Sequence, residues 1–391
     1  MLETPPTITH LIGPDTPALR GEVLRALCDQ PQPRHRIIQW GPAPAWATTS
    51  HQSPPLTEQE RIEPDRTIHA PFGATWLGQR ARDSLLAEIG TGVLHVWSLT
   101  ALRWVAAGLG RARCQVIVDI ELPAALGRLA SAIGSAWRDG RLCFVCPTDA
   151  ARQQAVATGA RSADCVLIRD CVDFARINAA RSERVRKTLR LATTDVVLLA
   201  LPPALPETAT FTAAWGALLL AQVIPRARLI VPGRGREVER VRRLVASCRQ
   251  EHVLRSPGMR FDLYALLAAA DVALYLPPGG APLAGMAAAM GAAVPIVATA
   301  TPLTTELLRH GHNAWLTLSD QPRDICRRLL DAIENRAQSR RQADTARAQA
   351  YKVFSRRRLI EQYARLWSNV TAGEPPASGI DDPAYIGAAS R

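Results

Sequence analysis

A loop rich in glycine and proline offers backbone amides that can bind an anion. Residues 277–282 read P-P-G-G-A-P and lead from an apolar run into a helical segment. The amides of Gly279, Gly280 and Ala281 would face an anion at the positive end of the helix dipole. Pro282 suits the first turn of that helix. The alternative is a plain turn between strand and helix that binds nothing.

A second glycine turn carries two cations. Arg234 and Arg236 flank Gly235, directly after Gly233 and another apolar run. Arginine binds phosphate groups well because its planar guanidinium presents several donors in a fixed geometry. We therefore predict that this turn binds an anionic ligand, with an exposed turn and solvated arginines as the alternative.

Four other polar residues are candidates for ligand contacts. Glu306 is expected to accept hydrogen bonds from sugar or ribose hydroxyls, or else to cap its own helix. His95 ends a predicted strand and is expected to face a cleft, or else to be a structural histidine. Asp119 and Glu121 alternate on one strand and so point to the same side.

The cysteines predict no metal site. Cys143 and Cys146 form a C-x-x-C inside the apolar run L-C-F-V-C, and no second such pair follows at zinc spacing. We expect both thiols to be buried in a strand and free of metal. The chain has eight cysteines, which in a sequence of this length do not indicate a disulfide framework.

The elements that must position these residues alternate between strand and helix. This alternation, with continuously apolar strands, is typical of parallel sheets covered on both faces. The predicted strands are residues 8–13, 36–40, 67–70, 93–98, 114–121, 142–147, 165–169, 195–201, 228–231, 252–255, 272–276 and 295–298. The predicted helices include 16–29, 77–89, 174–190, 210–223, 237–249, 263–270, 282–290, 323–350 and 355–368.

The pattern divides the chain into two domains. We predict an N-terminal, acceptor-side domain over residues 1–175, with an insertion rich in proline, serine and threonine at 42–64. A C-terminal, donor-side domain follows over 176–350. A closing helix at 351–370 returns to the first domain, and residues 371–391 form a disordered tail. Ligands of such sheets bind outside the carboxyl ends of the strands.

Composition excludes several classes of protein. With 47% hydrophobic residues, the chain has enough apolar side chains for a sizeable core and is not a disordered protein. The net charge of +12 comes almost entirely from dispersed arginines with few aromatics between them, which argues against a nucleic-acid partner. No apolar run is long enough to cross a bilayer, and the first residues lack the features of a signal peptide. We expect a cytoplasmic protein that contacts an anionic membrane at most peripherally.

The chain resembles the family 4 glycosyltransferases, which have the GT-B fold. Residues 224–235, I-P-R-A-R-L-I-V-P-G-R-G, are similar to the family's P-x-A-x-L-x-x-x-G-x-G, and residues 290–299, M-G-A-A-V-P-I-V-A-T, to its M-A-A-G-V-P-V-V-A-T. Residues 94–98, L-H-V-W-S, are similar to its V-H-x-H-S. The resemblance covers about residues 8–368. It implies an α/β protein of two doubly wound, Rossmann-like domains facing each other across a cleft.

The resemblance also identifies charges that this chain lacks. The family has two glutamates eight positions apart, and they align with Gly280 and Ala288. Its G-R-L-x-x-x-K-G loop, whose arginine and lysine hold the donor diphosphate, aligns with Pro202 and Glu207 at the two cationic positions. Arg234 and Arg236 are the candidates to replace those cations.

The function that the resemblance implies is transfer of a sugar from a nucleotide-sugar to a carbohydrate or lipid acceptor. The implied reaction retains the anomeric configuration and needs neither a metal nor a cofactor. The donor-binding candidates are the residues of the two glycine turns, Gly233 to Arg236 and Gly279 to Ala281, with Glu306. The acceptor-side candidates are His95, Asp119 and Glu121. The missing charges leave a second reading open, in which the protein is an inactive pseudoenzyme that binds a glycan, a nucleotide or a protein.

Overall fold

The computed structural model describes residues 7–13, 16, 18–31, 33–42, 64–69, 76–119, 141–201, 209–258, 261–277 and 283–380. The chain folds into two compact units. Among the described residues, the first unit contains those up to Asp170 together with those from Arg356 onward, and the second contains Cys171–Ser355. The predicted insertion lies outside the described residues except for its two ends, Pro42 and Pro64.

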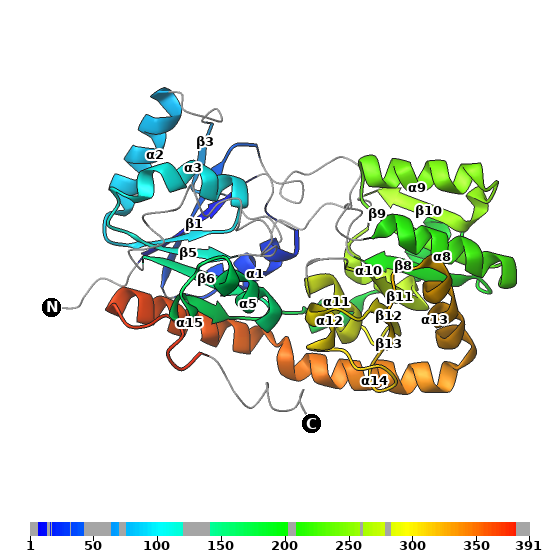
Figure 1. The fold of residues 1–391 in the computed structure, drawn as a ribbon. Helices are drawn as coiled ribbons and strands as arrows, with labels where there is room; N and C mark the ends of the chain where they lie inside the picture. The colour runs from blue at the N-terminus through cyan, green and yellow to red at the C-terminus, as the bar shows by residue number, and fades with distance from the viewer. Residues whose placement is uncertain are drawn as a thin grey trace. The chain divides into compact units, whose positions relative to one another are not determined.

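The first unit is built on a seven-stranded sheet in which every paired strand is parallel. The strand order is β3-β2-β1-β4-β5-β6-β7. Figure 1 labels β3, β1, β5 and β6 of this sheet. The strands are β1 (Thr7–Ile12), β2 (Arg34–Trp40), β3 (Arg66–Ile68), β4 (Val93–Val96), β5 (Gln115–Asp119), β6 (Leu142–Cys146) and β7 (Cys165–Leu167). The helices are α1 (Ala18–Cys28), α2 (Trp76–Ile89), α3 (Leu99–Leu109), α5 (Asp149–Ala157) and α15 (Arg356–Ala372).

Helices cover both faces of this sheet. Leu11 and Ile38 belong to a core cluster that also contains residues of α2 and α3. Because side chains alternate along a strand, the neighbouring His10 points to the opposite face. There it packs against Trp367 of α15. Helix α15 also contacts α1. The C-terminal helix therefore completes a face of the N-terminal sheet.

The second unit has a six-stranded parallel sheet of order β10-β9-β8-β11-β12-β13. Its strands are β8 (Val196–Leu201), β9 (Ala227–Pro232), β10 (Leu254–Gly258), β11 (Val272–Tyr275), β12 (Ile296–Thr299) and β13 (Trp315–Thr317). Its helices are α6 (Phe174–Ala179), α7 (Glu183–Thr188), α8 (Thr210–Val223), α9 (Arg236–Ser247), α10 (Leu263–Ala269), α11 (Leu283–Gly291), α12 (Pro302–Thr305), α13 (Pro322–Glu334) and α14 (Arg336–Val353). Two doubly wound parallel sheets confirm the predicted fold class.

The structure differs from the prediction at several elements. The charged segment 174–190 forms two short helices, α6 and α7, instead of one. The three-residue strand β13 was not predicted, because its apolar run is too short to show a period. The tail was predicted to be disordered from residue 371, yet α15 continues to Ala372 and Ile380 is buried. The Gln362 side chain donates to the Ile380 carbonyl, so the described part of the tail packs on α15.

Candidate functional site

The predicted glycine turn lies at the carboxyl edge of the second sheet. It follows β9, and α9 begins at Arg236 directly after it. Gly233 has φ of 104° and Gly235 has φ of 107°, a region that side chains other than glycine rarely adopt. The glycines are therefore required for the chain to reverse here and to bring the first amides of α9 to the sheet edge.

The end of the neighbouring strand closes the turn. The Gly233 amide donates to the Gly258 carbonyl at 3.0 Å, which joins the ends of β9 and β10. Gly258 has φ of +67°, and the Arg234 side chain lies directly against it. A β-carbon at position 258 would be 3.4 Å from Arg234 Nε. That distance is an ordinary contact, so the positive φ, and not lack of space, is what favours glycine at position 258.

A cavity of about 330 Å³ opens between these strand ends and α9. Its lining residues are Gly233, Arg234, Gly235, Val238, Glu239, Arg242, Ser256, Pro257 and Gly258. Two arginines and one glutamate line it, so its formal net charge is +1. Arg242 pairs with Glu239 on the same helix, whereas Arg234 comes from the turn itself. Arg236 is exposed and does not line the cavity. The arrangement can bind an anion through Arg234 and the positive end of the α9 dipole.

Among the described residues, the other predicted donor residues do not line this cavity. Gly279, Gly280 and Ala281 lie outside the described residues. Glu306 follows α12 after the carboxyl end of β12 and is not among the residues that line the cavity. The N-terminus of α12 is capped by the Thr301 side chain, so Glu306 does not have the alternative role of capping that end.

His95 and Asp119, predicted for the acceptor side, lie in the interior of the first unit, which favours the structural alternative for His95. Both side chains are fully buried, with His95 Nε2 3.8 Å from Asp119 Oδ2. The Tyr363 hydroxyl of α15 donates to Asp119, and the Trp97 ring stacks on His95 with centroids 4.3 Å apart. Helix α15 covers the strand end that was expected to face a cleft, so neither side chain is accessible to an acceptor. Glu121 lies outside the described residues.

Cys143 and Cys146 are buried in β6, as predicted. Burial raises the pKa of the Cys143 thiol. A hydrogen bond with Cys165 is the larger cause that raises the pKa of the Cys146 thiol, and burial is the second. These thiols remain protonated at neutral pH and do not act as nucleophiles.

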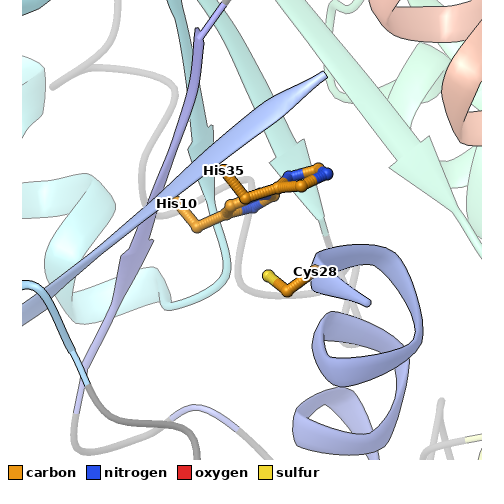
Figure 2. A group of neighbouring side chains, drawn as sticks. All are labelled: His10, Cys28 and His35. Atoms are coloured by element: carbon orange, nitrogen blue, oxygen red, sulfur yellow. The ribbon is translucent and has the colours of Figure 1, made fainter. Parts of the chain in front are cut away.

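A second group of side chains was not predicted from the sequence. A ring nitrogen of His10, a ring nitrogen of His35 and the sulfur of Cys28 lie within 4.8 Å of one another in the first unit (Figure 2). No spacing rule identifies this group, because the residues come from two strands and the end of a helix. The pairing of β1 with β2 brings the two histidines together.

Comparison with known proteins identifies relatives of the second unit and of the whole fold. Residues 206–335 match the family model described as Glycosyl transferases group 1. No curated protein matches the sequence. Among the described helices, none combines the length and apolar character needed to span a bilayer.

Solved structures share the fold at low sequence identity. HepE from Anabaena, in complex with UDP and glucose, has a TM-score of 0.77 at 19% identity, with 93% of this chain and 99% of that chain covered. Sucrose-phosphate synthase from Thermosynechococcus elongatus has a TM-score of 0.68 at 15% identity, covering 94% and 100%. A putative UDP-N-acetylglucosamine 2-epimerase from Listeria monocytogenes has a TM-score of 0.64 at 12% identity, covering 96% and 99%. At these identities the likeness shows the fold, which is GT-B.

Proposed function

We propose, from the GT-B fold and the match of residues 206–335 to the group 1 glycosyl transferases, that this protein transfers a sugar from a nucleotide-sugar donor. The acceptor that we propose is a carbohydrate or a lipid. We further propose a reaction that retains the anomeric configuration without a catalytic metal or cofactor, in a cytoplasmic protein that contacts membranes at most peripherally.

The cavity beside Arg234 is the observation that carries this proposal. It lies at the carboxyl edge of a parallel sheet, where ligands of doubly wound sheets bind. It combines a cation, the first amides of α9 and glycines that let a ligand approach the backbone. A diphosphate needs these features together, because the helix dipole alone contributes only about 0.3–1 kcal/mol.

The same features suit the chemistry of transfer. Cleavage of a nucleotide-sugar leaves negative charge on the departing nucleoside diphosphate, and an enzyme must stabilise that charge as it develops. Arg234 supplies a fixed positive charge next to the glycine turn. In this proposal it stabilises the leaving group, while the loop containing Gly279 and Gly280 supplies further amides.

Titration with nucleoside diphosphates tests the proposal. Calorimetry with UDP, GDP, ADP and their sugar conjugates should show binding of one nucleotide class at one site per chain. The preferred nucleotide-sugar is then incubated with candidate acceptors, and release of the nucleoside diphosphate is measured. Transfer to an acceptor, with the product's anomeric configuration read by NMR, would support the proposal. Release of a free, epimerised sugar would contradict it, and absence of binding to any nucleotide would refute it.

The second candidate is a protein that binds without turnover. Ala288, aligned with one of the family's glutamates, is 1% exposed in α11 and carries no carboxylate. Each preorganised charged contact that is lost commonly costs a factor of about 10²–10³ in rate. Nucleotide binding with no product from any donor and acceptor pair would favour this pseudoenzyme over the transferase.

A further inference from the structure

The group formed by His10, His35 and Cys28 connects three elements at one end of the first sheet. Cys28 is the last residue of α1, His35 is the second residue of β2, and His10 lies within β1. Figure 2 shows the Cys28 sulfur directed toward the two imidazole rings. His10 is fully buried, whereas Cys28 and His35 are partly exposed, so solvent reaches one side of the group.

The hydrogen bonds of His10 define where its proton lies. Trp97 Nε1 donates to His10 Nδ1 at 3.1 Å, and an indole nitrogen is a donor only. His10 Nδ1 is therefore unprotonated, and its proton is on Nε2. His10 Nε2 then donates to His35 Nδ1 at 2.9 Å. Both histidines are thus neutral, with two ring nitrogens facing each other across a hydrogen bond.

The protonation states of the three side chains bear on metal binding. Burial lowers the pKa of both histidines, so each ring is in the neutral form that binds metals. Burial and the carboxylates of Asp29 and Asp65 raise the pKa of the Cys28 thiol to about 12. Asp29 pairs with Arg356 and Asp65 accepts from the Ile37 amide, so a metal ion must itself overcome the raised pKa of the Cys28 thiol.

We propose that His10, His35 and Cys28 form a binding site for one Zn²⁺-class ion, coordinated by two imidazole nitrogens and one thiolate. Tetrahedral zinc bonds of about 2.0 Å to nitrogen and 2.3 Å to sulfur separate nitrogen ligands by about 3.3 Å and nitrogen from sulfur by about 3.6 Å. The observed atoms lie within about 1 Å of that arrangement. Zinc with three protein ligands keeps its fourth position for water, which reaches the site from the exposed side.

Binding requires a defined movement of protons. Cys28 loses its thiol proton to solvent. The His10 proton moves from Nε2 to Nδ1, because a neutral ring bound through Nε2 carries its proton on the other nitrogen. Net release is one proton per ion. Trp97 Nε1 then faces a protonated Nδ1 and loses its acceptor, so Trp97 opposes metal binding.

The position of the site separates it from the proposed sugar-transfer site. Cys28 and His35 flank the connection from α1 into β2, at the amino end of that strand. Ligands of doubly wound sheets bind at the carboxyl ends, so this ion is not placed for sugar transfer. It would fix α1 to β1 and β2, and Trp367 of α15 packs against both histidine rings beside it.

Cobalt titration of the metal-free, full-length protein tests the proposal. We expect one Co²⁺ per chain, with near-ultraviolet thiolate-to-cobalt absorption and visible bands of a tetrahedral ion, displaced by one equivalent of Zn²⁺. Cys28→Ser should remove the thiolate absorption and weaken binding at least about 100-fold. Cys248→Ser, which changes a partly exposed cysteine of the second unit, should leave both unchanged. Trp97→Phe should tighten binding about tenfold, because it removes the indole donor that would lose its partner.

Each result decides between the proposal and its rejection. Absence of stoichiometric binding, or thiolate absorption that persists in Cys28→Ser, would overturn the site. Weaker binding by a folded Trp97→Phe variant would overturn the proton arrangement. If Cys28→Ser does not fold, His35→Gln serves as the second variant, and unchanged Co²⁺ affinity in it would equally reject the site.

Discussion

Removal of the Arg234 guanidinium should weaken binding of the nucleoside diphosphate that the protein prefers. Arg234 and Arg236 are both exposed, but only Arg234 lines the cavity and lies against Gly258. A hydrogen bond to a charged group contributes about 1.5–3 kcal/mol, so Arg234→Ala should raise Kd about 10- to 150-fold. An exposed ion pair contributes about 0.2–1 kcal/mol, so Arg236→Ala should raise Kd less than about fivefold.

A matched control separates this local contact from the overall positive charge. Arg249 is exposed just beyond the far end of α9, which has 12 residues. At 1.5 Å per residue it lies about 18 Å or more from the cavity end of the helix, beyond the Debye length of about 8 Å at physiological salt. Calorimetry on Arg249→Ala should show unchanged Kd. Equal weakening in the Arg234 and Arg249 variants, or no weakening in either, would refute the reasoning.

Further predictions concern charge and stability. Glu207→Lys should tighten nucleoside diphosphate binding in the same calorimetric assay, because the resemblance places a cation at that position. Tyr363→Phe should lower the free energy of unfolding, measured in urea, by about 1.5–3 kcal/mol, because Asp119 loses its donor. Burial is the larger cause that lowers the pKa of His310, and the charge of Arg328 is the second. The neutral His310 ring therefore stabilises the folded protein above about pH 6.5, and this contribution is lost as pH falls below that value. His310→Asn should therefore reduce the loss of stability between pH 7 and pH 5.

Two of these predictions have a control variant in the same chain. Tyr351→Phe is the control for Tyr363→Phe. It removes the hydroxyl of a half-exposed tyrosine and should change the free energy of unfolding by less than about 0.5 kcal/mol. In His310→Asn the amide oxygen replaces Nδ1 as acceptor of the Leu316 amide without titrating. His312→Asn, at an exposed site two residues away, should leave the pH dependence unchanged. A weaker nucleotide affinity in Glu207→Lys would remove that residue from the donor site.

The strands and the glycine turn could be predicted because their signals are local. β8 is a six-residue apolar run, and every one of its side chains is buried. The turn at Gly233 and Gly235 follows an apolar strand, and both glycines adopt the positive φ that the residue type permits. Such features depend on neighbours within a few residues, which a sequence displays directly.

The side chains that meet in the first sheet could not be predicted in the same way. His10 lies opposite His95 because β1 pairs with β4, which is a choice of strand order. Tyr363 reaches Asp119 across 244 positions of sequence because α15 returns to the first unit. The apolar period of α15 shows that one face is buried, but it does not identify the surface that buries it. The sequence therefore left His95 open between a cleft residue and a structural histidine, and the structure places it in the interior.

The packing of α11 bears on whether the family's missing glutamate could simply be restored. Every residue of α11 is buried, and Ala288 is 1% exposed. A carboxylate at position 288 would enter a tightly packed helix without a described partner, and an uncompensated buried charge costs about 3–5 kcal/mol. We therefore expect Ala288→Glu to lower the free energy of unfolding by about that amount without increasing sugar transfer.

The matched substitution for this last prediction is Ala348→Glu. Ala348 is exposed on α14, so the same change there should alter stability by less than about 0.5 kcal/mol. Urea unfolding and the transfer assay on both variants distinguish the two explanations. If Ala288→Glu remained as stable as the unmodified protein and gained activity, a carboxylate site would persist around α11, and loss of this carboxylate would be one cause of reduced activity. Lower stability without a gain in transfer activity would mean that α11 has repacked around the smaller alanine side chain. Any sugar transfer must then use other groups, and Arg234 is the first candidate.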